Sequence, residues 1–304
     1  MFVSHDAKPI DISPFKHLYP FESNFLFING FRYHYIDEGV GDPLVMIHGN
    51  PTWSFYFRAL IREFSPCFRT IAMDHIGCGL SDKPSAERYD YTLQQRINDL
   101  KTFLDYIVEP PQKITLVLHD WGGMIGMAYA LQHLDRIQRL VVLNTAAFFP
   151  PSRRPIPLRL RVIRDLNFFS TVSVLGLNLF ARGALLMASN KKLPADVKAG
   201  LIAPYNCPQN RIATLMFVRD IPVKRTDPSY AVVRHVDNNL SKLRDIPMLI
   251  CWGMKDFVFD KTYLAEWRKR FPDATVHMFK DAGHYILEDA PQKVIDCMRD
   301  FMVS

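Results

Sequence analysis

This chain of 304 residues lacks several features that define other classes of protein. Its five cysteines are scattered, without Cys-x-x-Cys spacing, which favours free thiols in a reducing compartment over a disulfide framework or a zinc site. Residues 1–20 lack the basic start and apolar core of a secretion signal. The longest weakly polar run, residues 170–181, is shorter than the roughly 20 residues that a membrane span needs. We therefore expect a cytoplasmic protein without a transmembrane segment.

Acidic residues are scarce in one part of the chain. Residues 148–225 contain thirteen lysines and arginines but only three aspartates, whereas the whole chain carries a net charge of +6. Such a basic region suits an acidic protein partner, a membrane surface or a nucleic acid, or is simply a solvated face. Because no RNA-binding motif, zinc finger or helix-turn-helix pattern accompanies it, we expect no nucleic-acid partner.

Short apolar runs alternate with helical patterns over most of the chain. The Asn29-Gly30 pair between two such runs predicts a β-hairpin, and further strands are predicted at 44–47, 70–73, 114–118, 137–143, 248–251 and 274–279. Strands that alternate with helices predict a mostly parallel sheet flanked by helices. Over residues 148–225 the strand signals stop and helical signals replace them. The sequence therefore predicts an α/β core, residues 1–147 and 226–304, with a helical cap, residues 148–225, inserted between two core strands.

The most informative stretch runs from Leu116 to Gly123, where Asp120 separates an apolar strand from a helix that begins with Gly122 and Gly123. Small residues directly after a strand permit the sharp turn called a nucleophile elbow, and Asp120 occupies the usual position of serine. A carboxylate that attacks an alkyl carbon forms an ester, which can be cleaved again, whereas serine would form an inert ether. Asp120 is therefore a candidate nucleophile for displacement at an alkyl carbon or attack on a strained ring. The simpler alternative is a helix cap.

Two later residues complete a candidate triad. His284 follows the last predicted strand in a Gly-His loop and is the candidate base. Asp256 follows the strand that ends near Gly253, and its carboxylate would orient the imidazole of His284. Asp260 is the local rival for the acid, but it is better explained as a helix cap. The other common position for the acid holds Asn144, whose amide carries no charge.

Two uncharged donors flank the candidate nucleophile. Trp121 follows Asp120 directly, and Asn50 lies in the loop after an early strand. In an apolar cavity, the indole N–H and the side-chain amide would bind a departing halide or a developing oxyanion. The structural alternatives are core packing for Trp121 and a turn position for Asn50.

These residues resemble the motifs of the α/β-hydrolase superfamily and, within it, of the haloalkane dehalogenases. The resemblance covers nearly the whole chain and rests on residues 48–53, 74–81 and 119–123, and on Asp256 and His284. The pair Asn50 and Trp121 with the acid at Asp256 is similar to the third subfamily. Five further stretches resemble a group within that subfamily, the β-lactone decarboxylases of bacterial long-chain olefin biosynthesis: residues 144–148, 203–206, 210–214, 219–222 and 259–261.

The resemblance implies a hydrophobic substrate, a cis-3-alkyl-4-alkyloxetan-2-one, which is converted to a cis-alkene and carbon dioxide. Asp120 would attack the ring at its carbonyl or its alkyl carbon, and Asn50 and Trp121 would hold the oxygen that takes up charge. His284, oriented by Asp256, would handle protons or water. In the alternative, a haloalkane dehalogenase, Asp120 displaces a halide that Asn50 and Trp121 bind, and His284 activates water. Neither reaction implies a metal or an organic cofactor.

Two other functions of this fold fit the sequence less well. An epoxide hydrolase also uses an aspartate elbow but needs cap tyrosines, and the cap offers Tyr205 alone, with Tyr230 just beyond it. A fluoroacetate dehalogenase would need arginines beside the nucleophile, where Trp121 stands.

The predicted cap is expected to serve both substrate and partners. Its apolar residues would line a pocket above Asp120 or pack the cap on itself. They are Phe148, Phe149, Leu158, Leu160, Phe168, Phe169, Leu175, Leu177, Phe180, Leu185 and Met187. We expect the basic cap surface to dock other enzymes of an olefin pathway or to make peripheral contact with a membrane. Charge reversal at Arg153, Arg154 and Arg159 tests this expectation.

Overall fold

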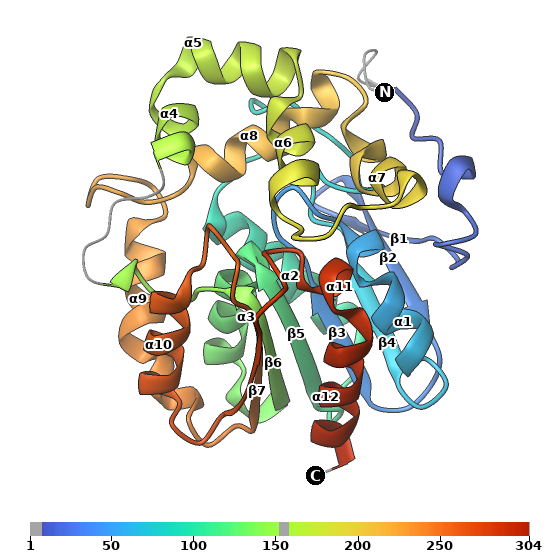
Figure 1. Cartoon of the computed structure of the whole chain (residues 1–304), viewed down its shortest axis with the longest axis vertical. Coiled ribbons are helices and arrows are strands. Elements are labelled where there is room, and N and C mark those ends of the chain that lie inside the picture. The colour runs from blue at the N-terminus through green and yellow to red at the C-terminus, as the bar shows by residue number, and fades with distance from the viewer. Residues whose placement is uncertain (1–7, 152–157, 304) are drawn as a thin grey trace.

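A computed structural model describes residues 8–151 and 158–303 and contains one eight-stranded sheet (Figure 1). The strands are β1 (Asn24–Ile28), β2 (Phe31–Glu38), β3 (Pro43–Ile47), β4 (Arg69–Met73), β5 (Ile114–Asp120), β6 (Ile137–Thr145), β7 (Met248–Gly253) and β8 (Thr275–Phe279). Their order in the sheet is β1-β2-β4-β3-β5-β6-β7-β8. Strand β2 is antiparallel to both of its neighbours, and all other neighbours are parallel. The predicted mostly parallel sheet is confirmed, as is the hairpin at Asn29 and Gly30, both of which have positive φ.

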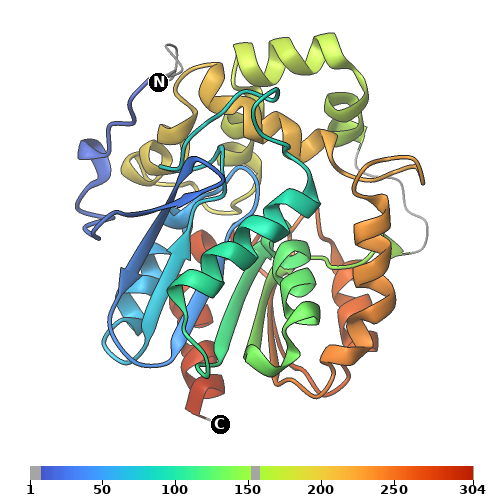
Figure 2. The same cartoon turned by 180° about the vertical axis from the view of Figure 1, so that it is seen from behind.

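Helices cover both faces of the sheet (Figures 1 and 2). The helical elements that precede β6 or follow residue 219 are η1 (Ser13–Phe15), η2 (Ser54–Phe57), α1 (Arg58–Phe64), α2 (Leu93–Ile107), α3 (Trp121–Gln132), η3 (Leu134–Arg136), α9 (Tyr230–Asn239), η8 (Leu240–Leu243), α10 (Lys261–Arg270), α11 (Ile286–Asp289) and α12 (Pro291–Val303). Successive residues of a strand point to opposite faces, so Leu116 and Leu118 of β5 pack with α2 and α3, and Val117 packs with α1 and α12. The central strands β3, β5 and β7 are therefore buried on both sides, as expected for a parallel sheet flanked by helices.

Between β6 and β7 the chain leaves the sheet and forms helices that lie together at one end of it (Figure 1). These are α4 (Leu158–Asp165), α5 (Asn167–Ser170), the π-helical turn η5 (Thr171–Gly176), α6 (Leu179–Met187), α7 (Ala195–Ile202), η6 (Ala203–Tyr205), η7 (Gln209–Arg211) and α8 (Ile212–Arg219). Helix α7 contacts the core where the Trp53 indole N–H donates to the Gly200 carbonyl at 2.9 Å. We call residues 158–219 the cap region.

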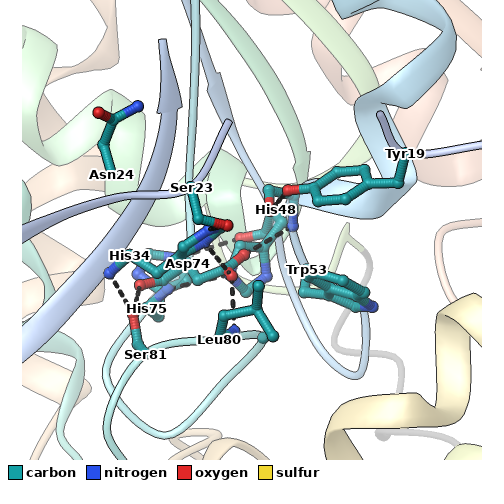
Figure 3. Close-up of polar contacts among 12 residues, drawn as sticks. Tyr19, Ser23, Asn24, His34, His48, Trp53, Asp74, His75, Leu80 and Ser81 are labelled. Carbon is teal, nitrogen blue, oxygen red and sulfur yellow. Dashed lines mark hydrogen bonds and ion pairs between the residues drawn. The ribbon is translucent and has the colours of Figure 1, made fainter. Parts of the chain in front are cut away.

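A buried polar cluster around Asp74 fixes the loop that follows β4 (Figure 3). Asp74 Oδ1 accepts a hydrogen bond from the Ser54 backbone N–H at 2.7 Å, and Oδ2 accepts one from the Leu80 N–H at 2.8 Å. The same Oδ2 lies 2.7 Å from His34 Nδ1 on β2. Gly79 has a φ of +47°, and a Cβ there would lie 2.0 Å from Asp74 Oδ2. The loop after β4 is therefore wrapped around a carboxylate and leaves no room for a side chain at this glycine.

Asp74 is expected to make stability depend on pH in the acid range. Burial alone would raise its pKa, but the attraction of His34 and the hydrogen bond to it outweigh burial and hold the pKa at about 2, below the ordinary 3.8. A depressed carboxyl pKa stabilises the fold above pH ~4, and this contribution of about 2 kcal/mol is lost as the pH falls toward 2. In urea unfolding between pH 4 and pH 2, the free energy of unfolding of Asp74→Asn should fall less steeply with pH than that of the wild type. The exposed control Asp273→Asn should keep the wild-type slope, and an equally steep slope in Asp74→Asn would contradict the assignment.

Candidate active site

Asp120 ends β5 and stands at a sharp turn into α3. Its φ of 52° and ψ of −126° are rarely adopted by residues with side chains, and the residue is only 7% exposed. Neighbouring backbone crowds this turn: a Cβ on Gly122 would lie 2.0 Å from the Ile47 carbonyl oxygen, and one on Gly49 would lie 2.1 Å from Asp120 Oδ1. The strand, turn and helix therefore have the geometry of a nucleophile elbow.

The side chains of Asp120, His284 and Asp256 lie together, although they follow three different strands. His284 Nε2 is 3.5 Å from Asp120 Oδ2, and His284 Nδ1 is 2.8 Å from Asp256 Oδ2. The other oxygen of Asp256 accepts hydrogen bonds from the backbone N–H groups of Val258 at 2.7 Å and Phe259 at 3.1 Å. All three members are buried. This arrangement can hold an imidazole in one orientation facing a carboxylate nucleophile.

The two carboxylates set the charge of the imidazole between them. Burial opposes a charge on His284, but attraction to Asp256 and hydrogen bonds to Asp120 and Asp256 raise its pKa to about 10. Burial also opposes a charge on Asp120, yet the hydrogen bond and charge of His284 keep the pKa of Asp120 below its ordinary value. Each of the two groups therefore favours the charged form of the other.

Asn50 and Trp121 both flank Asp120, but in different ways. The Asn50 backbone N–H donates to Asp120 Oδ1 at 2.7 Å, a contact that sequence reasoning missed. The Asn50 side-chain amide donates to the Thr214 carbonyl of α8 at 3.0 Å, and its Oδ1 has no hydrogen-bond partner among the described residues. Trp121 is partly exposed, and its ring packs against Phe217 of α8 with 5.5 Å between centroids. The cap region therefore contacts both candidate donors.

Comparison with known proteins agrees with this geometry. The model of the alpha/beta hydrolase family matches residues 44–297, which is most of the chain. The chain belongs to the α/β-hydrolase family. The haloalkane dehalogenase DatA from Agrobacterium tumefaciens superimposes on this α/β-hydrolase with a TM-score of 0.81 and 21% identity, covering 93% of this chain and 96% of that one. At this identity the likeness concerns the fold alone.

Relatives that are closer in sequence fall into two groups. A cis-3-alkyl-4-alkyloxetan-2-one decarboxylase of Shewanella oneidensis is 49% identical over 94% of this α/β-hydrolase and 90% of the relative. A decarboxylase with the same name from Xanthomonas campestris is 40% identical over 90% of this chain and 93% of its own. Haloalkane dehalogenase 2 of Mycobacterium bovis is 32% identical over 94% of this chain and 96% of its own length. This α/β-hydrolase is therefore an enzyme related to both groups, with higher identity to the decarboxylases.

Asn144 contributes to the site in a way that the sequence did not predict. Its side-chain Nδ2 donates to Asp256 Oδ2 at 2.9 Å and to the Gly253 carbonyl at 3.1 Å, and its Oδ1 accepts from the Gly253 N–H at 2.7 Å. The amide therefore fixes the end of β7 and orients the carboxylate of Asp256. One sequence signal could have indicated this role: Asn144 is a polar residue at the end of the buried strand β6. The sequence analysis used Asn144 only to exclude an acid at that position.

Two other histidines of the α/β-hydrolase support the surrounding loops. His119 Nε2 lies 2.9 Å from the His284 carbonyl oxygen, and burial, reinforced by repulsion from His284, lowers the pKa of His119 to about 3. His119 is therefore neutral and donates to that carbonyl. His48 bonds the Gly49 carbonyl at 2.7 Å and accepts the backbone N–H of His75 at 3.1 Å, so it also serves a turn.

Several residues predicted to line a pocket do not face the site. Phe168, Phe169, Leu177 and Met187 are exposed, and Phe148 instead packs against Trp267 in the core. The pocket prediction is wrong for these residues because helical periodicity identifies an apolar face but not which side of the cap region it covers. The partly buried members are Phe149, Leu160, Leu175, Phe180 and Leu185. The side chain of Leu158 lies outside the described part of the chain.

Other candidate binding sites are remote from the triad. Cavities of about 470 and 280 Å³ lie beside α10 and before β7, and both are bounded by Phe271, Pro272 and Ala274. Neither is lined by a member of the triad. Among residues 8–151 and 158–303, no group of three or more His, Cys, Asp or Glu is placed to hold a metal ion.

Proposed function

We propose that this α/β-hydrolase decarboxylates cis-3-alkyl-4-alkyloxetan-2-ones, strained β-lactones with two hydrophobic alkyl chains, to cis-alkenes. The observation that carries the proposal is the carboxylate of Asp120 on its elbow, with His284 Nε2 3.5 Å from Asp120 Oδ2. The decarboxylase of Shewanella oneidensis, 49% identical over most of both chains, supports the choice of substrate class. We propose Asp120 as nucleophile, His284 and Asp256 as its triad partners, and Asn50 and Trp121 as donors to the developing charge.

The reaction balances when Asp120 attacks the alkyl carbon that bears the ring oxygen. A bond forms between an Asp120 oxygen and that carbon, the ring C–O bond breaks, and its electron pair leaves with the substrate carboxylate. The bond from this carboxylate to the adjacent carbon then breaks, and its electrons form the alkene. The ester bond to Asp120 breaks at the same time, so carbon dioxide leaves and the Asp120 carboxylate is restored. No water and no oxidant are consumed.

Attack at the ring carbonyl would give a different product. It would produce a mixed anhydride on Asp120 and release an alkoxide, and hydrolysis of that anhydride would yield a β-hydroxy acid rather than an alkene. We therefore assign the productive attack to the alkyl carbon. Asn50 and Trp121 would hold the carboxylate that ring opening creates, and the protonated His284 would stabilise Asp120 as its charge returns.

A haloalkane dehalogenase is the second candidate, supported by the 32% identical relative from Mycobacterium bovis. In that cycle an ester on Asp120 removes one negative charge beside His284, which lowers the pKa of His284 and lets it accept a proton from water. The same donors would bind the halide.

Product analysis separates these functions. The purified chain is incubated with a cis-dialkyl β-lactone, 1-bromobutane and styrene oxide, and the products are identified by gas chromatography. We expect a cis-alkene from the lactone. Alcohol and bromide as the main products would establish a dehalogenase instead, a diol would indicate an epoxide hydrolase, and a β-hydroxy acid would refute attack at the alkyl carbon.

Trp121→Phe is expected to lower kcat about 10²-fold with a smaller change in KM, because it removes one N–H donor aimed at developing charge. The packing of the ring against Phe217 should persist. Trp53→Phe is the matched control, because its N–H bonds Gly200 of the cap region, so its loss should affect thermal stability more than kcat. A wild-type kcat in Trp121→Phe would mean that the ring only packs.

The domain division, the partner and the compartment are also proposals. We propose that residues 148–225 act as a cap over a core of residues 1–147 and 226–304. The basic cap would dock enzymes that supply its water-insoluble substrate. Arg153 and Arg154 lie outside the described residues and the Arg159 side chain is not described, so this docking proposal rests on the charge of the sequence alone. All five cysteines lie in the described residues and none forms a disulfide, which supports a reducing, cytoplasmic compartment.

A further inference from the structure

The outermost part of the cap region exposes large apolar side chains. It consists of α5, η5 and α6, and α5 lies at the end of the molecule opposite to the C-terminus (Figure 1). Eight side chains here are between 42% and 85% exposed, and we call them the apolar patch: Leu166, Phe168, Phe169, Val172, Leu177, Leu179, Leu186 and Met187. Exposed apolar residues scattered singly are ordinary, but eight of them within 22 consecutive positions make this part of the cap region a candidate contact surface.

Three polar residues of the same segment are buried. Ser170, Ser173 and Asn178 point into the cap region, where Ser170 accepts a hydrogen bond from Arg219 at 2.9 Å and Asn178 donates to the Tyr205 carbonyl at 3.1 Å. At these three positions hydroxyl and amide groups lie inside, while Asn167 and Thr171 are exposed beside phenyl and isobutyl groups. Large apolar side chains exposed in front of buried polar groups fit a surface that faces an apolar medium rather than water.

The length and shape of the segment indicate contact along a membrane surface rather than a crossing. No single helix of the described residues is long and apolar enough to cross a membrane. The pair Asn167–Gly176 and Leu179–Met187 has the required apolar length only when both are counted, and the two are bent by 71° relative to each other. A bent pair held to the cap region by buried hydrogen bonds would present its apolar residues sideways to an interface.

The charge of the segment complements an anionic surface. Residues 166–195 contain no aspartate or glutamate but include Arg182, Lys191 and Lys192. Arg182 and Lys192 are exposed, whereas the ammonium group of Lys191 bonds the Asp289 carbonyl. Basic residues beside an apolar face attract anionic lipid headgroups, and this attraction does not require a shaped partner.

We propose that α5, η5 and α6 dock this protein on the surface of an anionic lipid bilayer. The apolar patch enters the boundary between headgroups and acyl chains, and Arg182 and Lys192 lie among the headgroups. The docking holds whatever reaction the enzyme catalyses. Its benefit to substrate supply does rest on the proposed function: the cap region contacts Asn50 beside Asp120, so docking would bring the site close to the phase in which dialkyl lactones and alkenes dissolve.

Vesicle sedimentation with the full chain tests the docking. We expect binding to vesicles of phosphatidylcholine with phosphatidylglycerol, weaker binding to phosphatidylcholine alone, and a loss of the difference at ~1 M salt, where charges are screened within about 3 Å. Phe168→Ser combined with Leu186→Ser should weaken binding to both vesicle types at least about tenfold. Arg182→Glu combined with Lys192→Glu should weaken binding only to the anionic vesicles.

Matched controls outside the cap region distinguish the patch from general stickiness. Phe27→Ser replaces a phenylalanine that is 71% exposed on β1, and Lys113→Glu reverses an exposed charge before β5, so neither should change binding. The replaced Phe168 and Leu186 are 85% and 76% exposed, so thermal unfolding should match the wild type.

Three results would overturn the proposal. The first is wild-type protein that binds neither vesicle type, and the second is wild-type binding by the Phe168→Ser, Leu186→Ser variant. The third is a lipid-free oligomer, seen by light scattering, that the same variant converts to monomers, because the patch would then be a protein interface. None of these readouts depends on turnover, so failure of the docking and failure of the proposed decarboxylation are observed separately.

Discussion

Asp120→Ala is expected to lower alkene formation from a cis-β-lactone at least about 10⁴-fold, the largest effect expected of any single substitution in this chain. The substitution removes the carboxylate oxygens, which are the only atoms proposed to form a covalent bond with the substrate. His284 keeps its orientation, because Asp256 and not Asp120 accepts the closer hydrogen bond from the imidazole, at 2.8 Å. The rate of alkene formation should therefore fall by this amount while the other side chains of the site keep their positions.

Asp120→Asn separates the loss of the nucleophile from the loss of volume. An asparagine at this position still fills the turn and can accept the N–H of Asn50, but a neutral amide is a poor nucleophile. We expect both variants to be inactive by gas chromatography and to unfold at a temperature close to that of the wild type. Asp281→Ala, an exposed acid three residues before His284, is the control and should retain wild-type activity. Alkene formation by Asp120→Ala within tenfold of the wild type would refute covalent catalysis by Asp120.

Asp256→Asn is expected to lower kcat about 10⁴-fold, the scale seen when a triad carboxylate becomes an amide. Asp256 Oδ1 accepts two backbone N–H groups and Oδ2 accepts from Asn144 and His284. An amide has only one accepting oxygen. If the oxygen of the new asparagine keeps the two backbone hydrogen bonds, the NH₂ group of that asparagine faces the side-chain NH₂ of Asn144 and the N–H of His284. All three groups are donors, so no hydrogen bond forms between them. His284 must then rotate or change its tautomer, and it loses the geometry required toward Asp120.

The same substitution should change the pH dependence. Attraction to Asp256 is the largest influence that raises the pKa of His284, which burial alone would lower. Without that charge the pKa falls from about 10, so the imidazolium is lost at a lower pH and the alkaline limb of the kcat–pH profile moves to lower pH. Asp260→Asn is the matched control, since Asp260 accepts from the Thr262 N–H at 2.9 Å as a helix cap and asparagine caps equally well. An alkaline limb that does not move in Asp256→Asn would contradict this coupling.

Local sequence signals predicted the fold because they act over a few residues. The Asn29-Gly30 turn, the apolar runs and the glycines after Asp120 are each set by backbone sterics or burial. The chain order of Asp120, Asp256 and His284 indicated a triad, and the structure places the three side chains together, although their catalytic roles stay predictions.

Features that depend on neighbours distant in the chain were not predictable. The position of Asn144 against Asp256 depends on the pairing of β6 with β7, and the contact of the Asn50 N–H with Asp120 depends on the pairing of β3 with β5. In the cap region the π-helical turn η5 shifts the helical phase, so the pattern of apolar residues did not reveal which of them face outward.

Asn50 connects the cap region to the Asp120 carboxylate. Its backbone N–H bonds Asp120 Oδ1, and its side chain bonds the Thr214 carbonyl on α8. A displacement of α8 that breaks the second bond would free the side chain of Asn50, on the loop whose backbone N–H holds Asp120 Oδ1. The position of α8 is therefore coupled to the orientation of the Asp120 carboxylate.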